Sequence, residues 1–166
     1  MKSDGSETRQ LTNAPGYDGG PFFSHDGRRI VFRRDAHPDE ASLGRYKELL
    51  AQDLYRPGAL EIWVMNADGS GKRQVTTLGS ASFAPYFHPD DRRIVFSSNH
   101  PSPRGRNFDL WMIRDDGTSL ERVTTEPTFD GFPMFSPDAN PTCTRRRPGA
   151  QEGGSKNHMF EHKSNK

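Results

Sequence analysis

The feature that most constrains this chain is an internal repeat. The nine residues 4–12, which run Asp-Gly-Ser-Glu-Thr-Arg-Gln-Leu-Thr, recur with few changes at 68–76 and with more changes at 116–124. The first interval is 64 residues and the second is 48. A repeat at such intervals is typical of folds built by stacking one small unit beside the next. The secondary structure of one unit therefore determines the fold of the chain.

A second repeated block keeps the same two intervals. Residues 21–32, Pro-Phe-Phe-Ser-His-Asp-Gly-Arg-Arg-Ile-Val-Phe, match residues 85–96, and the pattern starts again at 133–138. Two independent blocks that agree on both intervals indicate true structural units.

Each unit predicts four short strands. Pro-x-Phe is followed by a turn rich in Asp, Gly and Pro, and then by Arg-Ile-Val-Phe, which suits a buried strand. A third strand is expected at 62–65 and again at 110–113, each followed by an Asp-Gly hairpin turn and the fourth strand. Four antiparallel strands in a unit of 40–50 residues are typical of a β-propeller blade.

The composition agrees with many short elements joined by turns. Leu, Ile, Val and Phe number 29 of 166 residues, about 17%, and Gly and Pro together number another 29. No run approaches the ~18 apolar residues of a membrane-spanning helix. We therefore predict an all-β fold without a deep core and without a membrane span.

Residues 33–60 are 16 residues longer than the corresponding segment 97–108. Within them we predict a short helical insertion at about 39–56, which ends at Pro57-Gly58. Its apolar residues share one helical face: Leu43, Tyr46, Leu49, Leu50 and Leu54. The helix could form a binding surface on the rim or could cap the blade beside it.

Residues 139–166 form a basic tail with a net charge of +4, against −3 for the rest of the chain. Where the repeat requires Arg-Arg-Ile-Val-Phe, residues 140–144 read Asn-Pro-Thr-Cys-Thr. We predict that this tail is disordered. Its charges are scattered and carry no nucleic-acid-binding motif, so no nucleic acid is expected as a partner.

A search for catalytic chemistry predicts that the chain is not an enzyme and needs no cofactor. There is no Gly-x-Ser-x-Gly motif of serine hydrolases. The six histidines lack the spacing of zinc ligands, so no metal site is expected. The single cysteine, Cys143, excludes an intramolecular disulfide.

Two carboxylates are candidate binding residues. Asp18 and Asp130 occupy equivalent positions before the first strands of their units, and Ser82 takes the position between them. First strands approach the central channel of a propeller, so the pair could bind a cation or a basic peptide end. Carboxylates in Asp-Gly turns also commonly accept hydrogen bonds from their own backbone.

Trp63 and Trp111 lie at matching positions in the third strands. Aromatic side chains repeated in this way usually fill the space between blades, and we expect these two to belong to the core.

The motifs at 66–76 and 129–138 make the chain resemble the TolB-type β-propeller repeat family over residues 4–138. The resemblance implies a propeller, usually six-bladed and periplasmic or secreted, that binds proteins or peptides without catalysis of its own. Similar repeats also occur as accessory propellers of secreted peptidases and other hydrolases, whose catalytic domain would then lie outside this chain.

The blades expected at about 21–76 and 85–124 are complete, with partial units on either side. Two blades cannot close a ring, since propellers typically have 4–8. We therefore expect a partial β-propeller, a fragment of a larger propeller or one completed by blades of another chain in an oligomer. The first residues carry no secretory signal peptide.

Overall fold

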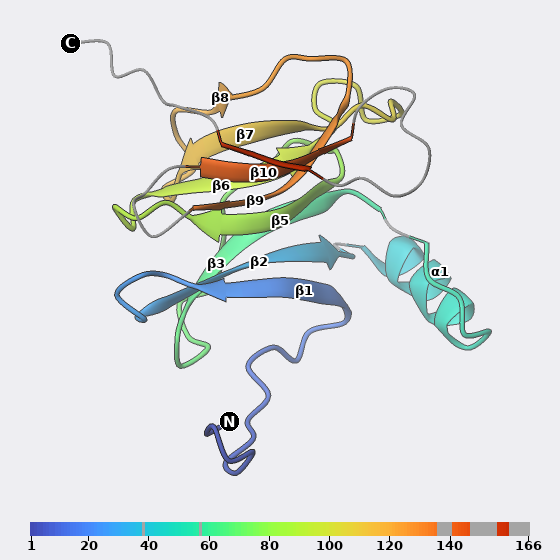
Figure 1. Ribbon diagram of the computed structural model, residues 1–166. Coiled ribbons are helices and arrows are strands. Elements are labelled where there is room, and N and C mark those ends of the chain that lie inside the picture. The colour runs from blue at the N-terminus through green and yellow to red at the C-terminus, as the bar shows by residue number, and fades with distance from the viewer. Residues whose placement is uncertain (38, 57, 136–140, 147–155, 160–166) are drawn as a thin grey trace.

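The computed structural model describes residues 1–37, 39–56, 58–135, 141–146 and 156–159 (Figure 1). The prediction of an all-β fold with one short helix is confirmed over this part of the chain. The first blade is a four-stranded antiparallel sheet in the order β1-β2-β3-β4. Its strands are β1 (Gly16–Phe23), β2 (Arg29–Ala36), β3 (Leu60–Asn66) and β4 (Arg73–Gln74).

The second blade repeats this sheet in the order β5-β6-β7-β8. Its strands are β5 (Ser82–Phe87), β6 (Arg93–Ser98), β7 (Asp109–Arg114) and β8 (Glu121–Arg122). A third sheet, in the order β11-β10-β9, follows, and its strand β9 contacts β5, β6 and β7 of the second blade. It contains β9 (Phe129–Phe135), β10 (Pro141–Arg146) and β11 (Lys156–Met159).

The third sheet differs from the disordered tail expected at 139–166. The strands β10 and β11 both lie in that range. The edge of β9 offers unpaired backbone groups, and a following segment can satisfy them by pairing whatever its side chains are. Sequence patterning therefore says little about such a strand. The other residues of the predicted tail lie outside the described residues.

The first strand of every unit carries the same β-bulge. Its residue with positive φ is Gly20 (60°), Ala84 (49°) and Phe132 (55°) in turn. The pairing register shifts at this point in all three sheets. A bulge with a left-handed residue twists and bends the strand, and only glycine adopts that conformation without strain.

An apolar core lies between the two blades. From the first blade come Val31, Ile62, Val64 and Val75, and from the second come Phe87, Ile94, Phe96, Trp111 and Ile113. Trp111 is 8% exposed, which confirms its predicted place in the core. Alternation along each strand sends successive side chains to opposite faces, so each blade presents one apolar face to each neighbour.

Charged groups at the turns join the same two blades. The carboxylate of Asp91 accepts hydrogen bonds from the backbone N–H groups of His25 (2.7 Å) and Asp26 (2.9 Å) in the first blade. The guanidinium of Arg29 pairs with the carboxylate of Asp115 and donates to the carbonyl oxygen of Asp91. All of these donors belong to the first blade and all of these acceptors to the second, so the two sides of the interface are chemically different.

The predicted insertion contains α1 (Glu40–Leu50). Asp39 caps it by accepting a hydrogen bond from the N–H of Ser42 at 2.8 Å. No residue of α1 is buried, and the helix stands beside the end of β2 (Figure 1). No helix in the described part of the chain is long and apolar enough to cross a membrane.

Candidate functional site

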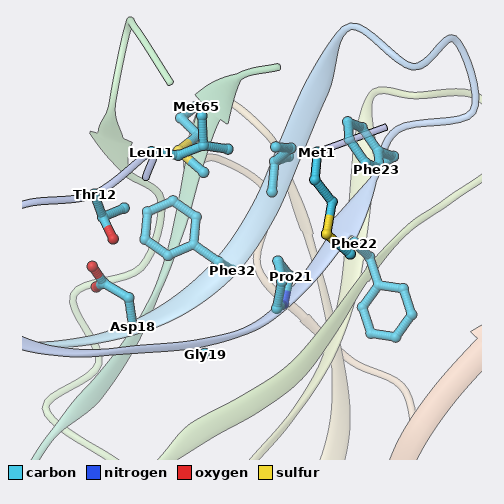
Figure 2. A pocket seen from close by; sticks show the side chains of 11 residues that line it. Met1, Leu11, Thr12, Asp18, Gly19, Pro21, Phe22, Phe23, Phe32 and Met65 are labelled. Atoms are coloured by element: carbon cyan, nitrogen blue, oxygen red, sulfur yellow. The ribbon is translucent and has the colours of Figure 1, made fainter. Parts of the chain in front are cut away.

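An apolar groove of about 470 Å³ lies on the outer face of the first blade. Asp18 and Thr12 lie at one end of it, and Phe22 and Phe23 lie at the other (Figure 2). The remaining lining residues are Met1, Leu11, Gly19, Pro21, Ile30, Phe32 and Met65. Phe23 is 61% exposed, whereas Phe87, at the same position in the next unit, is fully buried.

The groove lies on the face of the first blade that corresponds, in the repeat, to the face that the second blade buries against the first. Phe23 occupies the same position in its unit as Phe87, which is fully buried in the core between the blades. Ile30 and Phe32 correspond in the same way to Ile94 and Phe96 of that core. This face of the first blade therefore has the composition of a face that packs against another sheet, and it is exposed at Phe22 and Phe23.

Trp63 shares this outer face. It is half-buried and packs against the small cluster of Ile30, Phe32 and Met65, together with Leu11. Its counterpart Trp111 lies in the core between the blades. The two tryptophans therefore lie on equivalent faces of their blades, but the first blade covers Trp111, whereas Leu11 of the N-terminal segment packs on the cluster that contains Trp63.

The N-terminal segment covers part of the groove in the way that a fourth strand would. A Cβ added at Gly69 would lie 3.2 Å from the carbonyl oxygen of Leu11, and one added at Gly117 would lie 3.0 Å from that of Val75. Leu11 and Val75 are repeat counterparts. Each lies against the Asp-Gly turn of the unit that follows it. Residues 8–12 thus occupy the place of a preceding blade's fourth strand, and the groove lies where its other strands would pack.

Asp18, a predicted binding residue, lines the groove and is already paired. Both of its carboxylate oxygens lie 3.1 Å from Nη1 of Arg34, and the two residues face each other across β1 and β2. The guanidinium carbon of Arg34 also lies 5.6 Å from the centre of the Trp63 ring. A partner that uses Asp18 would have to share it with Arg34.

Asp130, the second predicted binding residue, lies in β9 outside the lining of the groove and is fully buried. Its N–H donates to the carbonyl oxygen of Phe108 at 2.8 Å, and it faces Arg145 in the strand register as Asp18 faces Arg34. Burial raises the pKa of nearby Asp109, with Asp130 adding to the rise and Arg122 opposing it. The two predicted carboxylates thus lie on the innermost strands of different units, with Ser82 between them in the repeat.

The insertion is held to the first blade by aromatic and polar contacts. The hydroxyls of Tyr46 and Tyr55 donate to the carbonyl oxygen of Gly16 (3.3 Å) and to the carboxylate of Asp35 (3.0 Å). Burial, and then the Asp35 carboxylate, raise the pKa of Tyr55. A cavity of about 270 Å³ between the helix and the strand ends is lined by His37, Ser42, Arg45, Tyr46, Leu49, Arg56 and Gly58.

The sequence did not identify the aromatic residues of the groove as functional, because they lie in blocks that also form the core. Whether such a residue is buried depends on the sheet beside it, which the repeated blocks do not specify. In the described residues there is no group of three or more His, Cys, Asp or Glu side chains that could hold a metal ion.

Comparisons with known proteins show a TolB-like propeller fold. A TolB protein from Agrobacterium tumefaciens superposes with a TM-score of 0.59 and 23% identity, and covers 84% of this chain and 42% of its own length. TolB from Acinetobacter baumannii gives 0.64 and 20% identity, over 93% of this chain and 33% of its own. A puromycin-hydrolyzing peptidase from Mycobacterium tuberculosis gives 0.62 and 15% identity, over 95% of this chain and 22% of its own.

In sequence, the chain is 31% identical over 94 residues to an uncharacterized protein, Atu1656, from Agrobacterium fabrum. The match covers 57% of this chain and 25% of that protein. No family model matches the chain. The chain therefore has the propeller fold and spans less than half the length of the proteins it resembles.

Proposed function

We propose that this chain is a non-catalytic β-propeller module that binds a protein or peptide in the groove of its first blade. The observation that carries the proposal is the contrast between Phe23, 61% exposed, and its buried counterpart Phe87. This face has the composition of an interface between blades, and it is exposed at Phe22 and Phe23, which favours a polypeptide that brings apolar side chains. The resemblance to TolB-type repeats supports a periplasmic or secreted location, which fractionation of cells expressing the native gene would test.

The partner expected from the geometry is an extended segment or a sheet edge. The groove is bounded on one side by residues 8–12, which pair with no strand in the described chain. Unpaired backbone groups beside an apolar surface are the two elements of recognition by strand addition, in which the main chain gives affinity and alternate side chains give specificity.

Selection of peptides from a random display library tests the proposal. The peptides retained by the chain should carry apolar residues at alternate positions. They should bind Phe23→Glu at least about 30-fold more weakly, as expected for the loss of a central apolar anchor. Leu54→Glu is the matched control, since Leu54 is an exposed apolar residue of the insertion, 54% exposed, away from the groove. Equal binding to the two variants would contradict the proposal.

A second candidate is the accessory propeller of a secreted hydrolase. It is favoured by the similarity to the puromycin-hydrolyzing peptidase, of which this chain covers 22%. The coding sequence beside the gene distinguishes the two functions, since a hydrolase domain with its own catalytic motif would support the second.

A further inference from the structure

We propose that the cavity between the insertion helix and the first blade binds a small organic anion, in which a carboxylate or phosphate group is attached to a short apolar part. The cavity shares no described lining residue with the groove of the first blade. The inference therefore goes beyond the proposed function and does not rest on it.

The cavity lies where one face of α1 meets the segments that leave β2 and enter β3. The helix contributes four residues whose spacing, i, i+3, i+4 and i+7, puts them on one face: Ser42, Arg45, Tyr46 and Leu49. His37 follows β2, and Arg56 and Gly58 precede β3. The volume of about 270 Å³ lies below the range of roughly 300–1,000 Å³ typical of drug-sized ligands, which favours a smaller molecule.

The cavity concentrates positive charge from a segment that is not basic. Residues 39–56 contain four Asp or Glu and three Lys or Arg, a net charge of −1. The described lining of the cavity nevertheless contains Arg45, Arg56 and His37 and no Asp or Glu. The arrangement of the side chains in space, and not the composition of the insertion, therefore makes this cavity attractive to an anion.

The two arginines of the cavity have no partner for their guanidinium groups among the described residues. Both side chains are exposed to solvent, and Arg45 does not pair with Glu48 although that residue is three positions further along the helix. Arg34, by contrast, pairs with Asp18. Two unpaired like charges that line one cavity repel each other, and an anion between them replaces the repulsion with attraction. The planar guanidinium group matches the oxygens of carboxylate and phosphate.

Two carboxylates contact residues of the cavity wall, and each already accepts hydrogen bonds from other donors. Asp39 accepts from the N–H of Ser42 at 2.8 Å. Asp35 accepts from the hydroxyl of Tyr55 and from the N–H of Gly58, both at 3.0 Å. Neither forms an ion pair with a cavity arginine, so the described chain supplies no acceptor to the two guanidinium groups.

The aromatic part of the wall is held in place without a ligand. The rings of His37 and Tyr46 stack with their centres 4.5 Å apart, and the hydroxyl of Tyr46 donates to the carbonyl oxygen of Gly16 at 3.3 Å. A wall that is already ordered reduces the entropy lost on binding. The Nε2 atom of His37 is buried and has no hydrogen-bond partner in the described chain, which is unfavourable for a polar atom. An anion beside the ring would supply an acceptor for its N–H.

The same wall indicates that the ligand has an apolar part. Leu49 lies one helical turn beyond Arg45, and Leu49 and Tyr46 are both half-buried. An inorganic ion would leave the apolar surface of these two side chains uncovered, whereas a small organic acid covers it while its charged group meets the arginines.

The first measurement compares three probes on the full wild-type chain at constant ionic strength: benzoate, phenyl phosphate and benzamide. Binding is followed by the imidazole NMR signals of His37, which are assigned with His37→Gln. At least one of the two acids should shift these signals saturably, and the tighter acid identifies the group that the cavity recognises. Benzamide has the shape of benzoate without its charge and should bind at least about 10-fold more weakly than that acid. No saturable shift with either acid, or equal binding of benzamide, would overturn the inference.

The second measurement removes the two charges. Arg45→Gln together with Arg56→Gln should weaken binding of the tighter acid at least about 10-fold while circular dichroism stays unchanged, because both side chains are exposed. Arg104→Gln together with Arg106→Gln is the matched control, since it removes the same charge from the exposed segment that corresponds to the insertion in the second unit. The control should bind as the wild type does, and equal weakening in the two variants would overturn the inference. The comparison of acid with amide uses the wild-type chain alone, so it decides the proposal whatever the stability of the variants.

Discussion

Replacing Asp91 with alanine will measure how strongly the turns join the two blades. The carboxylate accepts two backbone hydrogen bonds from the first blade, at 2.7 and 2.9 Å. Hydrogen bonds to a charged acceptor contribute about 1.5–3 kcal/mol when buried. These amides lie in an exposed turn where water can replace the carboxylate, which resembles the loss of a helix cap at about 0.5–2 kcal/mol. We therefore expect the free energy of unfolding to fall by about 1–2 kcal/mol.

Urea unfolding followed by circular dichroism is the assay. With a slope of about 2 kcal/mol per molar, typical of a small protein in urea, the midpoint should fall by about 0.5–1 M while the slope stays constant. Asp91 has a φ of 54°, so Asp91→Gly separates the loss of the carboxylate from the strain of an alanine in that conformation. Asp91→Asn should lie between wild type and the alanine variant, because it keeps one acceptor oxygen.

Glu126→Ala provides the matched control, since it removes an exposed carboxylate outside the interface. Its midpoint should equal that of the wild type. If Asp91→Ala unfolds at the same urea concentration as Glu126→Ala, the carboxylate does not join the blades, and the reasoning from the turn geometry is refuted.

Three further predictions concern stability. Gly20→Ala should destabilise the chain by about 1 kcal/mol, and Ala84→Gly at the equivalent bulge should have the opposite sign, because alanine is strained at positive φ; thermal unfolding of both variants will show whether the signs differ. Trp111→Ala should cost ~3–5 kcal/mol in urea unfolding, since the side chain fills the core between the blades, and a cost below about 1 kcal/mol would place it outside that core. Burial raises the pKa of Asp90, but hydrogen bonds from the backbone and from Arg93 outweigh it and lower the pKa from 3.8 to about 2. The stability that this carboxylate gives is present above pH 3.8 and lost as the pH falls through about 2, so Asp90→Asn should flatten the stability curve between those values, and an unchanged curve would contradict the assignment.

The fold could be predicted because the sequence repeats its own structural unit. Pro-x-Phe, Arg-Ile-Val-Phe and the Asp-Gly turn each specify one local element, and their recurrence specifies the sheet. The insertion helix was predictable for a similar local reason, since its cap at Asp39 and its apolar spacing need no knowledge of the neighbours. β10 could not be predicted, because it gains its conformation by pairing with β9 rather than from its own pattern.

The candidate site was harder to predict because burial depends on neighbours. Phe23 and Phe87 occupy the same position in the repeat, but Phe87 is covered by a neighbouring sheet and Phe23 is exposed. Asp18 could be selected from the sequence because a carboxylate recurs at its position in the repeat, at Asp130. Its pairing with Arg34 across β1 and β2 depends on the strand register, which the sequence alone did not supply.

The glycine of the repeated Asp-Gly turn satisfies two requirements at once. Its positive φ serves the hairpin of its own unit, and its missing side chain makes room for the chain of the unit before it. At Gly69 and Gly117 both requirements apply, whereas at Gly5 a Cβ would have nothing within 4 Å. The Asp-Gly motif therefore indicates a contact between neighbouring units as well as a turn. Each further copy of it in a sequence indicates a unit whose turn packs against the fourth strand of the unit before it.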